Sequence, residues 1–193
     1  MAKIQVIMGT TRTGRFNERV SPWVLQRLKD HRFDAELLDL RDYPLPFFDQ
    51  LPPSVTLRNY PTADIARLGH KLDEADGFVI LTGEYNHGYP AVLKNAIDHT
   101  HIEWHRKPVA YVGWGGVGGA RVIEQLRLVA IELEMAPLRN AVHILPEVIR
   151  PAMQSKDPTD FSVFEPIEPK LKALADGLEW WVRALATARA ADD

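Results

Sequence analysis

Three segments of this sequence combine glycines with polar, charged or aromatic side chains, and each follows a short apolar run. The first reads Gly9-Thr10-Thr11-Arg12-Thr13-Gly14-Arg15-Phe16-Asn17, the second Gly83-Glu84-Tyr85-Asn86 and the third Gly113-Trp114-Gly115-Gly116. Guanidiniums, hydroxyls and free backbone amides bind anions. Open α/β sheets bind ligands beyond the carboxyl ends of their strands. Three such segments at one sheet edge therefore indicate a site for a phosphorylated aromatic cofactor.

The first segment has the chemistry of an anion cradle and departs from the nucleotide P-loop. Gly9 and Gly14 have the P-loop spacing, but Arg15-Phe16 stand where Lys-Ser/Thr would contact phosphate and magnesium. What is left is a helix start with free backbone amides beside three hydroxyls, two guanidiniums and one carboxamide. These belong to Thr10, Thr11 and Thr13, to Arg12 and Arg15, and to Asn17. A plain turn with solvated arginines is the alternative to this phosphate site.

The other two segments suit the flat part of such a ligand. Gly113-x-Gly115-x-x-Gly118 matches the dinucleotide fingerprint, but no acidic residue follows at the end of the next strand to hold a ribose. We interpret these glycines as an opening for a flat ring, with Trp114 either as its wall or as a core side chain. The Glu84-Tyr85-Asn86 run could bond the polar edge of a heterocycle, or it could be a simple turn into the next helix.

Five apolar runs, at 4–8, 35–40, 78–81, 109–112 and 141–145, alternate with helical patterns and predict strands. This alternation is typical of a parallel sheet with right-handed crossovers. Two long connections, at 41–61 and 146–166, interrupt the pattern, and an amphipathic helix closes the chain. We find no domain linker, so residues 1–193 are expected to form one domain.

Composition excludes several classes of function. The chain has 193 residues, a net charge of −3, no cysteine and no apolar run near membrane-spanning length. We therefore expect no nucleic-acid or membrane partner and no thiolate chemistry. Without a signal-peptide pattern, we expect a cytoplasmic protein. His99, His101 and His105 do not share one helix face, so we interpret them as a solvated helix end and predict no metal site.

The chain resembles the NAD(P)H-dependent FMN reductase family, which has a flavodoxin-like fold and includes quinone, azo-dye and chromate reductases. The resemblance rests on Gly9-Thr10-Thr11-Arg12 with Asn17, on Glu84-Tyr85-Asn86 with Tyr89-Pro90, and on Leu93-Lys94-Asn95-Ala96. It implies a three-layer sandwich: a five-stranded parallel sheet of order 2-1-3-4-5 with helices on both faces. One departure is Gly83, which stands where the family usually has proline.

The resemblance also implies a cofactor and the residues that hold it. The FMN phosphate would be bound by Thr10, Arg12 and Asn17, assisted by the backbone of Gly14, Arg15 and Phe16. The isoalloxazine would be lined by Gly83, Glu84, Tyr85 and Asn86 and closed on its other side by Trp114, Gly115 and Gly116. No side chain is assigned as a catalytic acid or base.

The activity that follows is an FMN-dependent NAD(P)H oxidoreductase. NADPH or NADH would reduce FMN by ping-pong hydride transfer, and a flavin, quinone or similar small molecule would accept the electrons. The alternatives are a flavodoxin-like electron carrier and a non-catalytic sensor. We also expect a homodimer or homotetramer, because the flavin edge needs a cover and the 41–61 and 146–166 connections are long enough to reach a neighbour.

Overall fold

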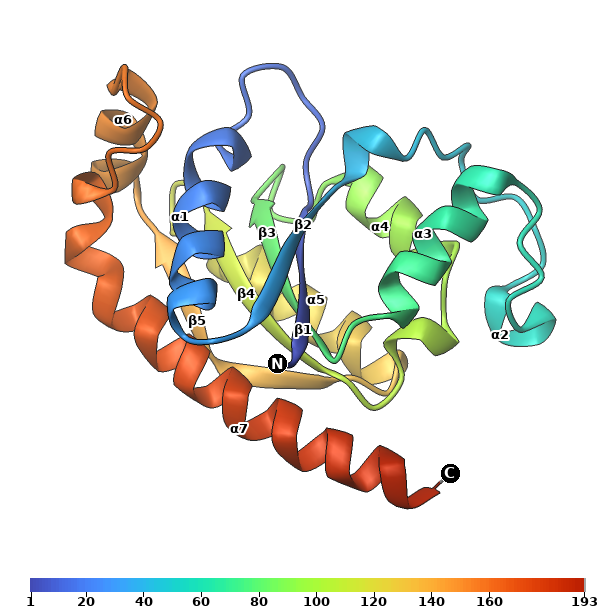
Figure 1. Ribbon diagram of the computed structural model, residues 1–193. Helices are drawn as coiled ribbons and strands as arrows, with labels where there is room; N and C mark the ends of the chain where they lie inside the picture. Colours follow the sequence, from blue (N-terminus) through green and yellow to red (C-terminus); the bar gives the residue numbers. More distant parts are fainter. Residues whose placement is uncertain (193) are drawn as a thin grey trace.

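The fold is built around one parallel sheet, described here from a computed structural model that covers residues 1–192; residue 193, the last of the expected domain, lies outside the described residues. Its strand order is β2-β1-β3-β4-β5, which confirms the predicted topology (Figure 1). The strands are β1 (Lys3–Met8), β2 (Asp34–Asp39), β3 (Gly77–Gly83), β4 (Pro108–Trp114) and β5 (Ala136–Ile144).

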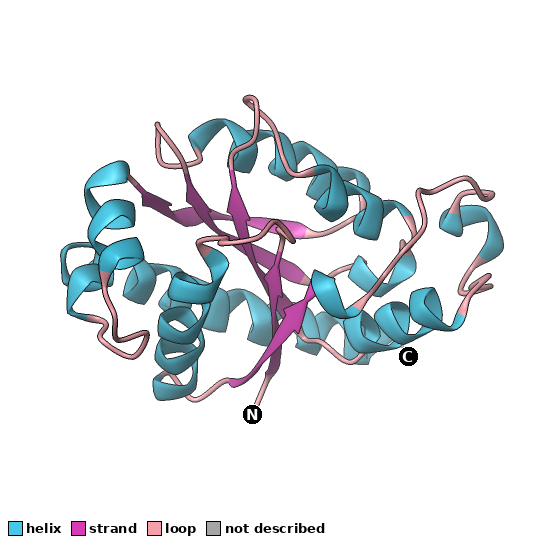
Figure 2. Ribbon diagram, turned by 90° about the horizontal axis from the view of Figure 1, so that it is seen from above, coloured by secondary structure: helices cyan, strands magenta, loops and turns pink. Residues whose placement is uncertain are grey.

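Helices cover both faces of this sheet, as Figure 2 shows from above. The α-helices are α1 (Asn17–Asp30), α2 (Pro53–Thr56), α3 (Ala63–Asp73), α4 (Ala91–Asp98), α5 (Ala120–Glu132), α6 (Pro146–Gln154) and α7 (Glu168–Asp192). Three short 3-10 helices complete the chain: η1 (Leu40–Asp42), η2 (Ile102–Trp104) and η3 (Ser162–Ile167). Within residues 1–192, no helix is both long and apolar enough to cross a membrane.

Alternating side chains of the buried strands feed two separate cores. On one face, Val6, Val79 and Val112 pack with the apolar stripes of α1 and α7. On the other face, Ile7 and Ile80 pack with α3, α4 and α5. Because neighbouring side chains of a strand point to opposite faces, continuous apolar strands are buried on both sides. The flavodoxin-like three-layer sandwich is therefore confirmed.

The strand register brings the three glycine-bearing segments to one edge. Met8 pairs with Leu81, and Leu81 pairs with Val112. Beyond these pairs, Gly9 N donates to Leu81 O at 2.9 Å and Glu84 N donates to Trp114 O at 2.9 Å. The segments after β1, β3 and β4 therefore begin level with one another and are tied together by backbone hydrogen bonds.

The two long connections contain more regular structure than the sequence indicated. Residues 146–166 form α6 and most of η3, and residues 41–61 include α2. Pro146 occupies the first turn of α6, where its missing N–H costs nothing, and Pro151 lies inside the helix without ending it. The proline content of 146–166 had masked a short amphipathic helix.

The 41–61 connection is fastened to α4. Phe48 N donates to Asn95 Oδ1 at 2.9 Å, and Asn95 Nδ2 donates to Pro46 O at 2.8 Å. His99 Nε2 lies 2.9 Å from the same Pro46 oxygen, and the side chain of His99 is 3% exposed. The expectation of a solvated histidine is therefore wrong for His99, because the connection folds back over it.

Candidate cofactor site

A cavity of about 340 Å³ lies where the three segments meet. Nine of the predicted residues line it: Arg12, Gly14, Phe16, Gly83, Glu84, Tyr85, Trp114, Gly115 and Gly116. Four residues of α6 complete the lining: Pro146, Ile149, Arg150 and Met153. Its volume is in the range of ligand sites, which are usually a few hundred cubic ångströms. The predicted residues outside this lining are Thr10, Arg15, Asn17 and Asn86.

The first segment presents a run of unused backbone donors. Among the described residues, none accepts a hydrogen bond from the backbone N–H groups of residues 11 to 17. Phe16 occupies the N-cap of α1 and supplies no side-chain cap. Gly14 has φ +63°, and a Cβ placed there would meet nothing within 4 Å. Unbonded amides at a helix start form a ready-made anion site.

The carbonyls of the same segment are held by two arginines. Arg15 Nη1 donates to Thr10 O at 2.6 Å. Arg41, just after β2, donates to Thr11 O at 3.1 Å through Nε and to Arg12 O at 2.7 Å through Nη2. With three consecutive carbonyl oxygens engaged by guanidiniums, the segment keeps its amide donors available for a ligand.

The side chain of Arg15 is buried and does not line the cavity. Its side chain is 3% exposed and forms a bidentate ion pair with Asp39 at the end of β2, one bond of which measures 2.6 Å. Burial raises the pKa of Asp39, but the hydrogen bonds from Arg15 and Arg41 N outweigh it and the pKa is lowered. The side chain of Arg15 therefore shapes the segment, and the phosphate contact predicted for Arg15 falls to its backbone N–H, which has no acceptor among the described residues.

Arg12 is the cation of the first segment that lines the cavity. Its guanidinium carbon lies 5.4 Å from the centre of the Tyr85 ring, and within residues 1–192 no carboxylate pairs with it. Arg15 and Arg41 are balanced by Asp39 and Glu18. The positive charge offered to a ligand by this segment is thus that of Arg12.

Thr10 and Asn17 link the segment to the sheet. Thr10 Oγ1 donates to Asn17 Oδ1 at 2.7 Å, and Asn17 Nδ2 donates to Leu81 O at 3.3 Å. Both side chains are buried. They fix the start of α1 against β3. Neither residue lines the cavity, and their contact with a phosphate stays a prediction.

The second segment is a tight turn, and its carboxylate, that of Glu84, already has hydrogen-bond partners in the protein. Tyr85 and Gly88 exchange two backbone hydrogen bonds of 3.0 Å around Asn86 and His87, which both have positive φ as in a two-residue hairpin loop. The Glu84 carboxylate, 4% exposed, accepts from Arg121 Nε at 2.6 Å and from Arg121 N at 3.2 Å. Glu84 thereby caps α5.

The electrostatics of Glu84 follow from these contacts. Burial raises its pKa, but Arg121 and the first backbone N–H groups of α5 outweigh that effect and lower it. Glu84 is consequently an ionised, fully engaged carboxylate. Its carboxylate joins the second segment to the start of α5, and a bond from residue 84 to a heterocycle stays a prediction.

In the third segment, Trp114 is both a core side chain and part of the cavity wall. Its indole packs edge-on against Phe16, with ring centres 5.4 Å apart, and is buried. Gly115 has φ +153° and lies against Glu84, while nothing occupies the space within 4 Å of a Cβ on Gly116. Trp114 is therefore both the core side chain and the cavity wall that the sequence left as alternatives.

Sequence reasoning missed Asp39, Arg41, Arg121 and the α6 residues. Asp39 and Arg41 gave a usable signal, because Asp39 ends a strand that neighbours β1 in a sheet of this order and Arg41 lies just after it. Arg121 and α6 gave none, since neither belongs to a glycine-bearing segment.

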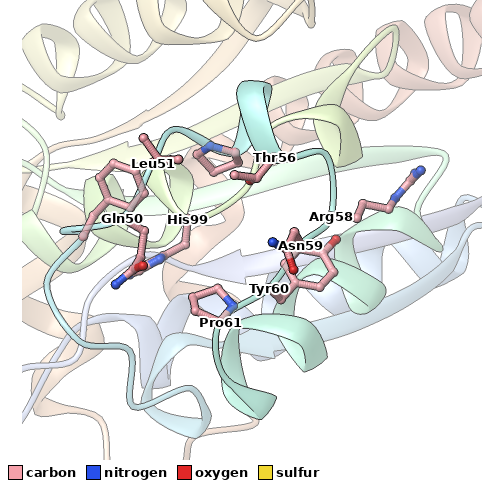
Figure 3. A pocket seen from close by; sticks show the side chains of 10 residues that line it. Gln50, Leu51, Thr56, Arg58, Asn59, Tyr60, Pro61 and His99 are labelled. Atoms are coloured by element: carbon pink, nitrogen blue, oxygen red, sulfur yellow. The ribbon is translucent and has the colours of Figure 1, made fainter.

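A second hollow, of about 180 Å³, lies beneath the 41–61 connection, and Figure 3 shows its side chains. Three of its polar side chains are engaged: Tyr60 donates to the buried Glu103, Arg58 pairs with Asp73 at 2.6 Å, and His99 contacts Pro46 O. This hollow is away from the three segments, and we assign it no chemistry.

The sheet order and the three segments define a flavodoxin-like protein. The family model of NADPH-dependent FMN reductases matches residues 2–148. The chain therefore belongs to the NADPH-dependent FMN reductase family. The match ends inside α6, so most of the α6 wall and all of α7 lie outside it.

Individual relatives agree with this assignment. The chain is 38% identical over 161 residues to an NAD(P)H-dependent FMN reductase of Schizosaccharomyces pombe, covering 79% of this chain and 80% of that protein. It is 29% identical over 190 residues to a 2-hydroxy-1,4-benzoquinone reductase of Burkholderia sp, covering 94% and 96%. The solved structure of FerB, a flavoenzyme NAD(P)H:(acceptor) oxidoreductase from Paracoccus denitrificans, superposes with a TM-score of 0.72 at 23% identity, covering 95% and 98%.

Proposed function

We propose that this protein is an FMN-dependent NAD(P)H oxidoreductase that works by a ping-pong mechanism with a quinone-like acceptor. The observation that carries the proposal is the union, in one cavity, of an unbonded amide run, a free arginine and a glycine-lined slot. NAD(P)H binds first and leaves oxidised, and the acceptor then enters the same opening. FMN supplies the redox chemistry, and the protein orients it and tunes its electronics.

The residues present fit FMN at both of its ends. The amides of residues 11 to 17 and the guanidinium of Arg12 suit a dianionic phosphate. Gly83, Glu84, Tyr85, Trp114, Gly115 and Gly116 line the cavity, and the open space beside Gly116 leaves room for a flat ring. A flavin with an adenylate would need a second phosphate cradle, and the other two glycine-bearing segments contain no serine, threonine or arginine to form one.

The protein groups at the cavity have positioning roles. Glu84 is held by Arg121 and by the start of α5, so it is not available as a proton donor or acceptor. Tyr85 offers its ring to Arg12. Reduction of a quinone takes two electrons and two protons; the hydride carries both electrons and one proton, and solvent supplies the other proton.

The acceptor proposal rests on shape and on one relative. A slot bordered by glycines, Tyr85 and Trp114 suits a flat ring. The Burkholderia relative, which aligns over nearly the whole chain, is named for a benzoquinone. We therefore propose a quinone ahead of a flavin or an azo compound. The cytoplasm is the expected location.

We further propose that the working form is a homodimer or a pair of dimers. Phe47, Leu51 and Val55 on the 41–61 connection are exposed, as are Trp180 and Trp181 on α7. Large exposed apolar groups of this kind mark interfaces. Light scattering at working concentration tests the proposal, and a monomer would contradict it.

Two measurements test the redox proposal. Purified protein should carry a flavin absorbance spectrum, and the extracted flavin should be FMN by chromatography. In stopped flow, anaerobic NADPH should bleach that absorbance before any acceptor is added, and a benzoquinone should restore it in a second mixing step. A carrier would bind FMN but react slowly with NAD(P)H. A sensor without cofactor would be colourless and gain no thermal stability from FMN.

A further inference from the structure

The α6 wall of the cavity carries a second uncompensated cation. Arg150 lies on the cavity lining between Ile149 and Met153 of the same helix. In the described part of the chain, no carboxylate pairs with its guanidinium and no acceptor bonds it. The helix contributes an apolar strip with one free guanidinium to a cavity otherwise built from loops.

The phosphate of FMN does not account for Arg150. That phosphate already has the amides of residues 11 to 17 and Arg12, which come from the β1–α1 segment. Arg150 belongs to α6, which begins after β5 and is not part of that segment. Because it lines the cavity and has no protein partner among the described residues, Arg150 is free to bind a second anionic ligand.

The electron donor has the chemistry that this wall fits. Its nicotinamide must enter the cavity to reach the flavin, so the rest of the dinucleotide has to leave across the rim. There it would meet Ile149 and Met153, whose side chain is 41% exposed, and the Arg150 guanidinium. Arginine binds phosphate through two parallel, charge-assisted bonds, and apolar side chains cover the faces of bases.

We propose that Arg150 on α6 binds a phosphate group of the dinucleotide electron donor and thereby sets the affinity for NADPH. The inference rests on the proposed function, because it assumes that the donor enters this cavity. The phosphate is either the 2′-phosphate, which NADPH has and NADH lacks, or the pyrophosphate that both share.

Calorimetric titration of the FMN-loaded protein with NADP⁺ and with NAD⁺ tests the proposal without turnover. Arg150→Ala should weaken NADP⁺ binding by about tenfold, which is typical of a lost hydrogen bond to a charged group. Arg150→Lys should recover part of the loss. Equal loss for NAD⁺ assigns the pyrophosphate, and loss for NADP⁺ alone assigns the 2′-phosphate. The apparent Kd for NADPH in rapid flavin reduction should follow the same pattern.

Two controls separate the outcomes. Arg183→Ala removes an exposed arginine of α7, outside the cavity lining, and should leave both affinities unchanged. Titration of apoprotein with FMN should give the wild-type Kd for Arg150→Ala. Unchanged NADP⁺ binding, or a fall in FMN affinity instead, would overturn the inference. A wild-type protein that neither binds FMN nor reacts with NADPH would contradict the proposed function itself.

Discussion

The indole of Trp114 occupies the space into which a side chain at Gly83 would extend. A Cβ on residue 83 would lie 2.9 Å from Trp114 Nε1 and 3.2 Å from Tyr85 Cε1. Trp114 cannot easily withdraw, because its other edge packs on Phe16. The glycine that replaces the family's usual proline is therefore matched to this tryptophan.

Gly83→Ala should lower stability by roughly 1–3 kcal/mol, the usual cost of overpacking a filled core, and should also weaken FMN binding. The matched test is a double-mutant cycle with Trp114→Phe, which removes the Nε1 edge. In the Trp114→Phe background the alanine should cost less, as measured by urea unfolding. Equal costs in the two backgrounds would show that the indole does not set the identity of residue 83.

Arg12→Ala should weaken FMN binding about tenfold to a hundredfold, because a hydrogen bond to a charged group is worth roughly 1.5–3 kcal/mol. Stability should change by no more than about 0.5 kcal/mol, since Arg12 is exposed and unpaired. Affinity is measured on apoprotein with FMN and with riboflavin. Riboflavin lacks the phosphate, so its affinity should not depend on Arg12.

The neighbouring arginine provides the contrast. Arg15→Ala should destabilise the protein by roughly 2–3 kcal/mol, because it leaves Asp39 without its buried partner. Arg139→Ala, an exposed position on β5, is the control for loss of positive charge alone. If Arg12→Ala unfolded the protein and Arg15→Ala did not, the assignment of the two arginines would have to be exchanged.

Glu84→Gln should cost roughly 1–2 kcal/mol at neutral pH, because it removes the charge that holds Arg121 and the start of α5. The folded pKa of Glu84 lies below its unfolded value, so the contribution is present above the unfolded pKa and is lost as pH falls through the folded pKa. Urea unfolding of both proteins across pH 3 to 7 should show the difference shrinking toward acid pH, to about a few tenths of a kcal/mol. A difference that stays constant would contradict the ionic role.

Lys107 should make stability rise with pH in the alkaline range. Burial lowers the pKa of its ammonium to about 8, and Nζ donates to Leu72 O at 3.1 Å and to Asp73 O at 2.9 Å at the end of α3. Since the unfolded pKa is higher, the unfolded chain binds more protons between the two values. Relative to Lys107→Met, the wild type should gain roughly 2 kcal/mol between pH 7 and pH 10. If the unfolding midpoints of the wild type and of Lys107→Met changed equally with pH, the lowered pKa of Lys107 would be refuted.

The fold and the candidate site were predictable to different depths. Continuous apolar strands and the helices between them predict a parallel sheet with right-handed crossovers, and the family resemblance supplied its strand order. The location of the site follows, since the three segments end neighbouring strands. The roles of single residues could not be predicted from the sequence. Arg12 and Arg15 have the same chemistry in the sequence, and only the position of Asp39, 24 residues further on, separates the buried arginine from the free one.

Helix α6 was missed for a related reason. Its prolines at 146 and 151 are typical of a loop, and they masked the helical spacing of its apolar residues. Packing of Ala152 and η3 against the core stabilises it instead. Tertiary contacts of this kind leave no signal in a short window of sequence.

Arg15 and Arg41 donate hydrogen bonds to the carbonyls of the first segment, those of Thr10, Thr11 and Arg12. These bonds have a consequence for the rate of FMN binding. A loop that is ordered before its ligand arrives pays little conformational entropy on binding. FMN association should then be governed by diffusion and by the pull of Arg12, with no slow closing step. The residence time of FMN would then be set mainly by how rarely its phosphate dissociates from the backbone amides of residues 11 to 17.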